Sequence, residues 1–240
     1  MPYRRLPNTS QARLRALKAA LEQTQTQDPT NLRVSPKTAL ELVSFVPIYE
    51  QTLQQYVACR EKQTEVSKSV TETGKVARLY LSHFIQVFNM CVARGEIKPE
   101  AREMLGLTEC GGAVPDLTSD QSLIDWGRKV VEGDERRSTS TGGGCRIYNP
   151  SVALVKVKLQ IFEEHFNKYR DLLSTSKKFK DKLDEVTQSA DELILKVWNE
   201  VEGSLAPVDT DEKRELCKQY GVVYFFRTQE LQKEFLMGQF

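Results

Sequence analysis

The sequence predicts an all-α protein in which internally duplicated helical hairpins form an antiparallel four-helix bundle with short flanking helices. Two observations predict this class: apolar residues recur at helical spacing, and the same pattern returns after about 113 residues. Composition agrees, since 40% of the 240 residues are hydrophobic and 28% are charged, as in soluble globular proteins. The formal net charge of +1 argues against a dedicated nucleic-acid binder, which normally carries a clear basic excess.

The repeat divides the chain into a first helical repeat, residues 1–114, and a second, residues 115–240, which we expect to fold as one unit. Its matching residues keep their order. Thr9, Ser10 and Leu14 recur as Thr118, Ser119 and Leu123, and Pro36, Ala39, Leu40 and Val43 recur as Pro150, Ala153, Leu154 and Val157. The alternative is two separate helical units joined near residues 110–116.

Each repeat contains an apolar stripe whose residues step by threes, fours and sevens, typical of an amphipathic helix with one core-facing side. The first stripe is Val66, Val70, Ala77, Phe84, Phe88 and Cys91, and the second is Phe179, Leu183, Val186, Ala190, Leu193, Val197 and Val201. We expect two helices of about 25 residues in each hairpin. In the second repeat, residues 174–176 are expected to form the turn between them.

Polar residues and glycines indicate where these helices begin and end. The expected N-caps are Ser35 and Asn149 for the long helices, and the pairs Thr9-Ser10 and Thr118-Ser119 for the short preceding helices. Gly106 and Gly221 are expected to end short helices in the left-handed conformation.

Two segments fall outside the repeat pattern. Residues 134–141, with the following Gly142–Gly144, are expected to form a mobile loop; an anion nest beside Arg146 is the alternative. The apolar run 222–226 is expected to be a strand or the start of a last helix.

The chain offers no signal for export, membrane insertion or disulfide cross-linking. Five cysteines, none in C-x-x-C spacing, argue against a disulfide framework or a structural zinc site. No apolar stretch follows the basic N-terminus, and none approaches the ~18 residues of a membrane span. We therefore expect a cytoplasmic protein with no membrane association.

The opening M-P-Y-R-R-L-P-N-T resembles the start of an uncharacterised family of bacterial helical proteins. This resemblance implies a bacterial cytoplasmic origin. It brings no activity and no functional residues.

No catalytic constellation emerges from the titratable residues. Neither His83 nor His165 belongs to the Glu-x-x-His motif of a di-iron bundle. Among the cysteines, Cys145 is the candidate reactive thiol, because it lies between three glycines and Arg146. We expect no catalytic residue, cofactor or metal.

Three functions remain open, and the first is preferred. It is a non-enzymatic interaction or structural role with a protein partner, or with a second copy in a homodimer, and its candidate contacts are Tyr224, Phe225, Phe226, Phe235 and Leu236. The second is a small-ligand-binding bundle or an enzyme with its site between the repeats. The third is weak nucleic-acid association through an anion-binding cluster of Arg4, Arg5, Arg13 and Arg15.

Overall fold

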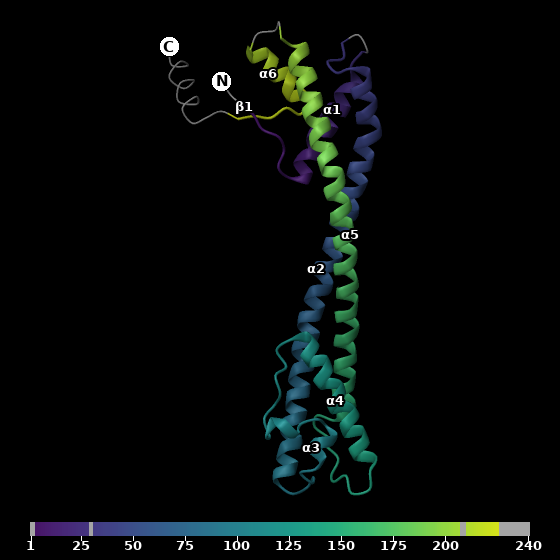
Figure 1. The fold of residues 1–240 in the computed structure, drawn as a ribbon, viewed down its shortest axis with the longest axis vertical. Helices are drawn as coiled ribbons and strands as arrows, with labels where there is room; N and C mark the ends of the chain where they lie inside the picture. Colours follow the sequence, from purple (N-terminus) through teal and green to yellow (C-terminus); the bar gives the residue numbers. More distant parts are fainter. Residues whose placement is uncertain (1–2, 29–30, 207–209, 226–240) are drawn as a thin grey trace, which may run out of the picture. The chain divides into compact units, whose positions relative to one another are not determined.

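The computed structural model describes residues 3–28, 31–206 and 210–225, and these form an all-α structure with one short β-ribbon (Figure 1). The predicted all-α class is confirmed. The α-helices are α1 (Ser10–Thr26), α2 (Pro36–Ala93), α3 (Ala101–Met104), α4 (Asp120–Thr139), α5 (Val152–Ser204) and α6 (Thr210–Gln219). Two-residue strands β1 (Tyr3–Arg4) and β2 (Tyr224–Phe225) and the 3-10 helix η1 (Thr108–Cys110) complete the described elements.

The chain forms two compact units, and each takes residues from both predicted repeats. Unit 1 comprises residues 1–59 and 176–240, and unit 2 comprises residues 60–175. Helices α2 and α5 contribute to both units. The compact units therefore do not coincide with the repeats 1–114 and 115–240, which remain a prediction about the origin of the sequence.

Unit 1 packs α1 and α6 against the first part of α2 and the last part of α5. Its core is centred on the large buried side chains Leu17, Leu42, Tyr49, Trp198 and Tyr220. The α2 and α5 segments run antiparallel, since Glu41 pairs with Lys196 while Thr38 donates a hydrogen bond to Glu200. Burial of this apolar surface stabilises the unit.

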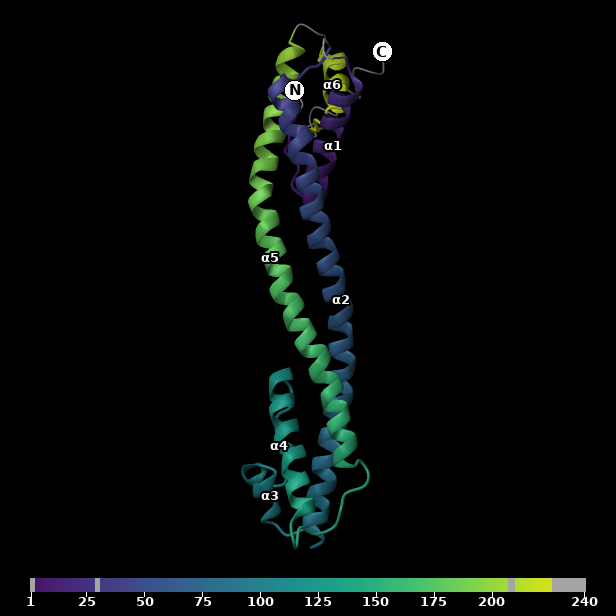
Figure 2. The ribbon, with the colours of Figure 1, turned by 90° about the vertical axis from the view of Figure 1, so that its right-hand side faces the viewer.

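Unit 2 packs α4 and α3 against the other parts of α2 and α5 (Figure 2). Phe84, Phe88 and Phe162 are fully buried in its core, where Leu123 and Val130 of α4 meet them. Close packing depends on a glycine. A Cβ on Gly133 would lie 2.3 Å from the carbonyl oxygen of Met104, so only glycine lets α4 approach the end of α3 this closely.

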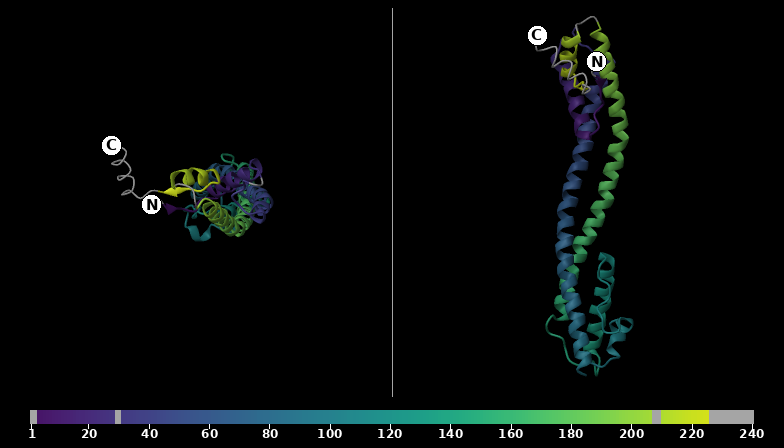
Figure 3. Two further views of the ribbon diagram at one scale, coloured as in Figure 1. Left: turned by 90° about the horizontal axis from the view of Figure 1, so that it is seen from above. Right: turned by 90° about the vertical axis from the view of Figure 1, so that its left-hand side faces the viewer.

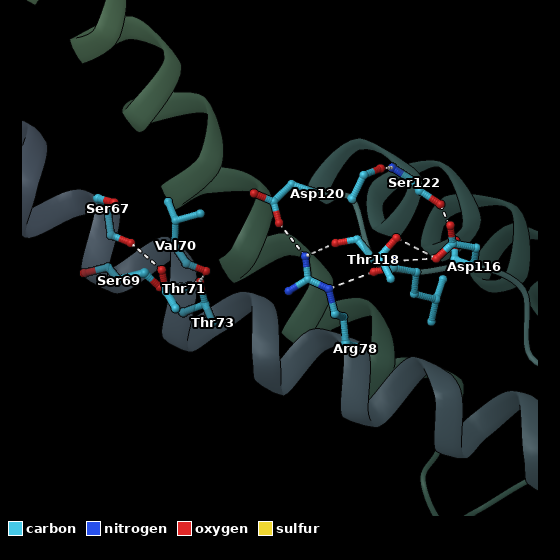
Figure 4. Close-up of polar contacts among 12 residues, drawn as sticks. Ser67, Ser69, Val70, Thr71, Thr73, Arg78, Asp116, Thr118, Asp120 and Ser122 are labelled. Atoms are coloured by element: carbon cyan, nitrogen blue, oxygen red, sulfur yellow. Dashed lines mark hydrogen bonds and ion pairs between the residues drawn. The ribbon is translucent and has the colours of Figure 1, made fainter.

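Arg78 of α2 anchors the start of α4 (Figure 4). Its guanidinium donates hydrogen bonds to the carbonyl oxygens of Leu117 and Thr118, at 2.8 and 3.2 Å, and to the Asp120 carboxylate. The Ser119 hydroxyl accepts a hydrogen bond from the backbone N–H of Ser122, so Ser119 is the N-cap within the predicted pair Thr118-Ser119. The connection before α4 is thereby tied to the long helix.

The prediction of separate helices of about 25 residues is wrong. Helix α2 has 58 residues and α5 has 53, and α5 continues through the expected turn at residues 174–176. No glycine or proline lies there to end the helix. Serine and threonine lower helix propensity by only about 0.5 kcal/mol each, which is too little to end a helix when the residues on either side, such as Leu173 and Lys177, are strong helix formers.

The predicted mobile loop at residues 134–141 is also wrong over most of its length. Residues 134–139 belong to α4, where Asp134 and Arg137 form a buried ion pair with side chains only 4% and 1% exposed. Arg137 also donates hydrogen bonds to the carbonyl oxygens of Gly143 and Cys145, at 2.5 and 3.0 Å. The following glycine-rich turn is therefore held by α4.

The other predicted helix boundaries fare better. Thr9 caps α1, and Ser35 caps α2 through its hydroxyl and the backbone N–H of Thr38. For α5 the cap is Ser151 and not Asn149, because the Ser151 hydroxyl accepts from Leu154 N–H and α5 begins at Val152. Gly106 and Gly221 adopt φ values of +71° and +80° after α3 and α6, as predicted.

In the described part of the chain, none of the helices is both long enough and apolar enough to cross a membrane.

Candidate functional site

The N-terminal segment and the apolar tail, predicted separately as candidate contact regions, meet in unit 1 (Figure 3). Strands β1 and β2 pair antiparallel, with Tyr3 opposite Phe225 and Arg4 opposite Tyr224. The backbone N–H of Arg5 extends the ribbon by donating to the carbonyl oxygen of Val223 at 3.2 Å. Tyr224 and Phe225 of the predicted run thus form a strand, which was one of the two expectations, whereas Val222 and Val223 precede it.

A groove of about 450 Å³ lies between this ribbon, α1 and the end of α6. We call it the ribbon groove. Small and apolar residues form most of its lining: Leu6, Pro7, Ala12, Ala16, Ala19, Gly221, Val222, Val223 and Phe225. Three cationic residues, Arg5, Arg15 and Lys218, and Asn8 complete it. An apolar surface edged by positive charge suits an amphipathic ligand of negative charge.

The groove depends on the close approach of α6 to α1. Gly221 has a φ of +80°, and a Cβ there would lie 2.8 Å from both Cα and the carbonyl oxygen of Ala16. Glycine is needed at this position for its conformation and for the contact. On the far side of the ribbon, the Tyr224 hydroxyl donates a hydrogen bond to Glu202 at 2.8 Å. Burial, with Cys217 and Glu202 nearby, raises the pKa of the Tyr224 hydroxyl, so it stays protonated as the donor.

The predicted arginine cluster is divided by the fold. Arg4 forms an ion pair with Glu202 at 3.0 Å, and Arg13 forms one with Asp191 at 2.7 Å. Arg5 and Arg15 instead line the groove, and in the described residues neither forms an ion pair with an acidic side chain. The Arg5 guanidinium lies over the Phe225 ring, 5.9 Å from its centroid.

Of the predicted contact residues in the tail, Phe225 lines the groove and Tyr224 lies half-buried in the adjoining strand. Phe226, Phe235 and Leu236 lie outside the described residues.

No protein family matches the chain. No curated protein and no solved structure matches it either. The site must therefore be interpreted from its own geometry and chemistry.

A second cluster lies in unit 2, where Cys145 meets Cys91 and Glu96. The Cys145 thiol lies 3.6 Å from a Glu96 carboxylate oxygen, Oε2. Burial, with Cys91 and Glu96 close by, raises the pKa of the Cys145 thiol. This direction disfavours the thiolate at neutral pH and does not support the predicted reactivity of Cys145 as a free nucleophile. Sequence analysis missed the cluster because Cys91 and Cys145 are far apart in the chain and no metal-binding spacing joins them.

The largest aromatic side chains occupy the cores of the two units. The aromatic residues Tyr49 and Trp198 belong to the core of unit 1, and Phe84, Phe88 and Phe162 belong to that of unit 2. They fill the two cores. His83 is exposed, whereas His165 is half-buried.

Proposed function

We propose that the protein is a non-enzymatic interaction module whose ribbon groove binds an acidic, amphipathic segment of a partner protein. The observation that carries this proposal is the groove itself, where Arg5 and Arg15 lie free of acidic partners in the described structure beside an apolar lining. Acidic side chains of the partner would pair with the two guanidinium groups. Its apolar side chains would pack against the alanines of α1 and the valines before β2.

Only two of the four predicted arginines line the groove, and this favours a protein segment over a nucleic acid as the ligand. Nucleic-acid affinity rises with the number of phosphates that cations neutralise. Arg4 and Arg13 are already paired with Glu202 and Asp191, which leaves few free cations near the groove. The apolar lining offers nothing to a phosphate backbone and much to leucine-like side chains.

We also propose that the chain arose by internal duplication, and matching details of the two units support this. Gly106 N–H donates to the carbonyl of Glu103, and Leu107 N–H donates to that of Arg102, at the end of α3. After α6, Gly221 and Val222 donate to Lys218 and Cys217 in the same pattern. Both ends are therefore Schellman caps, a common helix ending that α2 also has, where Gly95 and Glu96 donate to the carbonyls of Val92 and Cys91.

Exposed residues give independent support, because the core does not dictate them. Leu40 and Leu154 are 71% and 39% exposed, and Val43 and Val157 are both 48% exposed. These pairs follow the offset of 114 residues in the predicted repeat, but they lie two residues deeper in α2 than in α5 when counted from the first helical residue. Apolar side chains kept at exposed positions favour common descent or a shared contact role.

A displayed library of random peptides, selected against the full-length protein, tests the proposal. We expect enriched sequences that combine Asp or Glu with apolar residues at helical spacing. Their binding should be lost in Ala19→Trp, which fills the groove from α1 without changing its charge. Enrichment of uncharged sequences, or binding that survives Ala19→Trp in the folded variant, would contradict the proposal.

A further inference from the structure

We propose that Cys91, Glu96 and Cys145 form a binding site for a thiophilic divalent cation of the zinc type. This inference concerns unit 2 and is independent of the function proposed for the ribbon groove. The two thiol sulfurs and a carboxylate oxygen lie within 4.8 Å of one another. Cysteine sulfur and carboxylate oxygen are both ordinary zinc ligands.

The spacing of the donor atoms fits tetrahedral coordination. Zinc binds sulfur at about 2.3 Å and carboxylate oxygen at about 2.0–2.2 Å, which places two such ligands about 3.5 Å apart. The observed distance from Cys145 Sγ to Glu96 Oε2 is 3.6 Å. Little rearrangement is therefore needed for a cation to contact both atoms.

Backbone contacts hold the three ligands in place. Cys91 is buried near the end of α2, and its carbonyl accepts a hydrogen bond from Glu96 N–H at 2.9 Å. The Glu96 carbonyl in turn accepts from Cys145 N–H at 3.2 Å. Arg137 fixes the Cys145 carbonyl from α4. Ligands held in this way lose little freedom when a metal binds.

The turn before Cys145 is shaped for this approach. Gly144 has a φ of +78°, and a Cβ there would lie 2.6 Å from the carbonyl oxygen of Glu96. Only glycine lets the backbone come this close to the Glu96 segment. The glycine run, predicted to be flexible, instead brings the sulfur of Cys145 close to the sulfur of Cys91.

Charge also fits a divalent cation. Two thiolates and a carboxylate around a divalent ion leave one net negative charge. The guanidinium of Arg94 lies 3.0 Å from a Glu96 oxygen and 3.6 Å from Cys91 Sγ, where it offsets that charge. Thiolate ligands favour zinc-type ions over magnesium or calcium. Three protein ligands leave a fourth position for water or another molecule.

Anaerobic titration of the reduced full-length protein with cobalt(II), followed by competition with zinc, tests the proposal. We expect one cobalt per chain with thiolate-to-cobalt charge-transfer absorption, and full displacement by zinc. Cys145→Ser and Glu96→Gln should each weaken binding at least about tenfold. Cys110→Ser is the matched control, since Cys110 is also half-buried in unit 2 but lies outside the cluster. Circular dichroism verifies that each variant folds.

Two results would overturn the site. One is the absence of thiolate-to-cobalt absorption when the reduced protein is titrated. That result would overturn the metal site even if Cys91 and Cys145 formed a disulfide on exposure to air. The other is equal weakening by Cys110→Ser and Cys145→Ser, which would place the cobalt elsewhere.

Discussion

Arg13 of α1 and Asp191 of α5 are joined by two hydrogen bonds, with Nε–Oδ1 and Nη2–Oδ2 distances of 2.7 and 2.9 Å. This fork-to-fork geometry is the strongest that an arginine and a carboxylate can adopt. This pair fixes α1. Arg15, two residues further along the same helix, lines the ribbon groove. Two arginines that look alike in the sequence therefore have different roles, one structural and one available for binding.

Replacing Asp191 with Asn should lower the free energy of unfolding by about 0.5–1 kcal/mol, the upper range for a partly exposed pair. Arg15→Gln should leave stability within about 0.5 kcal/mol of the wild type, because it breaks no ion pair in the described structure. Urea unfolding of both variants measures the difference. Equal stabilities of the two variants would show that the Arg13–Asp191 pair does not fix α1.

Asp134→Asn should be far more damaging. It would leave the Arg137 guanidinium, 1% exposed, without its countercharge, at a cost of about 3–5 kcal/mol. The matched control is Asp184→Asn in α5, which breaks an exposed ion pair with Lys180 and should cost less than about 0.5 kcal/mol. Thermal unfolding compares the two. A small effect of Asp134→Asn would mean that Arg137 is not buried in solution.

Gly133→Ala should destabilise unit 2 by about 1–3 kcal/mol, because its new methyl group would overlap the backbone of Met104 and Leu105. Gly203→Ala in α5 meets nothing within 4 Å. It should be neutral or stabilising by up to about 1 kcal/mol through helix propensity. Chemical denaturation distinguishes them, and equal effects would contradict the close packing of α3 on α4.

Stability should fall in acid partly through Glu200. Burial alone would raise the pKa of the Glu200 carboxyl, but hydrogen bonds from the Ser35 N–H and the Thr38 and Ser35 hydroxyls outweigh it and lower that pKa below 4.5. Because folding favours the charged form, this contribution is complete above the ordinary pKa and is lost as the pH falls through the lowered value.

The comparison with Glu200→Gln isolates this contribution. The wild type should be the more stable protein near pH 7, and the gap should narrow as the pH is lowered to about 3. The free energy of unfolding of both proteins, measured between pH 7 and about 3, shows whether the difference narrows or widens. A gap that widens in acid would mean that the carboxylate is not the form of Glu200 that binds Ser35 and Thr38.

Local signals predicted much of the fold, because they depend on few neighbouring residues. The N-caps Thr9, Ser35 and Ser119, the ends at Gly106 and Gly221, and the core stripe through Phe84 and Phe88 are all decided by short-range pattern. The length of α2 and α5 was not predicted. Residues 174–176 are Ser-Thr-Ser, which are weak helix formers, but no glycine or proline is present there to end the helix.

The candidate sites depend on contacts between distant residues, which a single sequence does not display. Arg13 and Arg15 could not be told apart without Asp191 in view, and the pairing of β1 with β2 joins opposite ends of the chain. The charged stretch that contains Asp134 and Arg137 was predicted to be a mobile loop. Its burial became evident only with the carbonyl groups of Gly143 and Cys145 that Arg137 binds.

The most direct test of the proposed function is the affinity of one library-selected acidic peptide for four proteins, measured by fluorescence anisotropy at two salt concentrations. The proteins are the wild type, the double variant Arg5→Gln/Arg15→Gln, Ala19→Trp, and the control Lys177→Gln/Lys178→Gln. The control removes two exposed charges from α5 in the same unit, outside the groove. We predict that both groove variants weaken binding at least about tenfold, which is 1.4 kcal/mol, while the control binds like the wild type. Equal weakening by the control and the double variant would reduce the interaction to net charge and contradict a specific site in the ribbon groove.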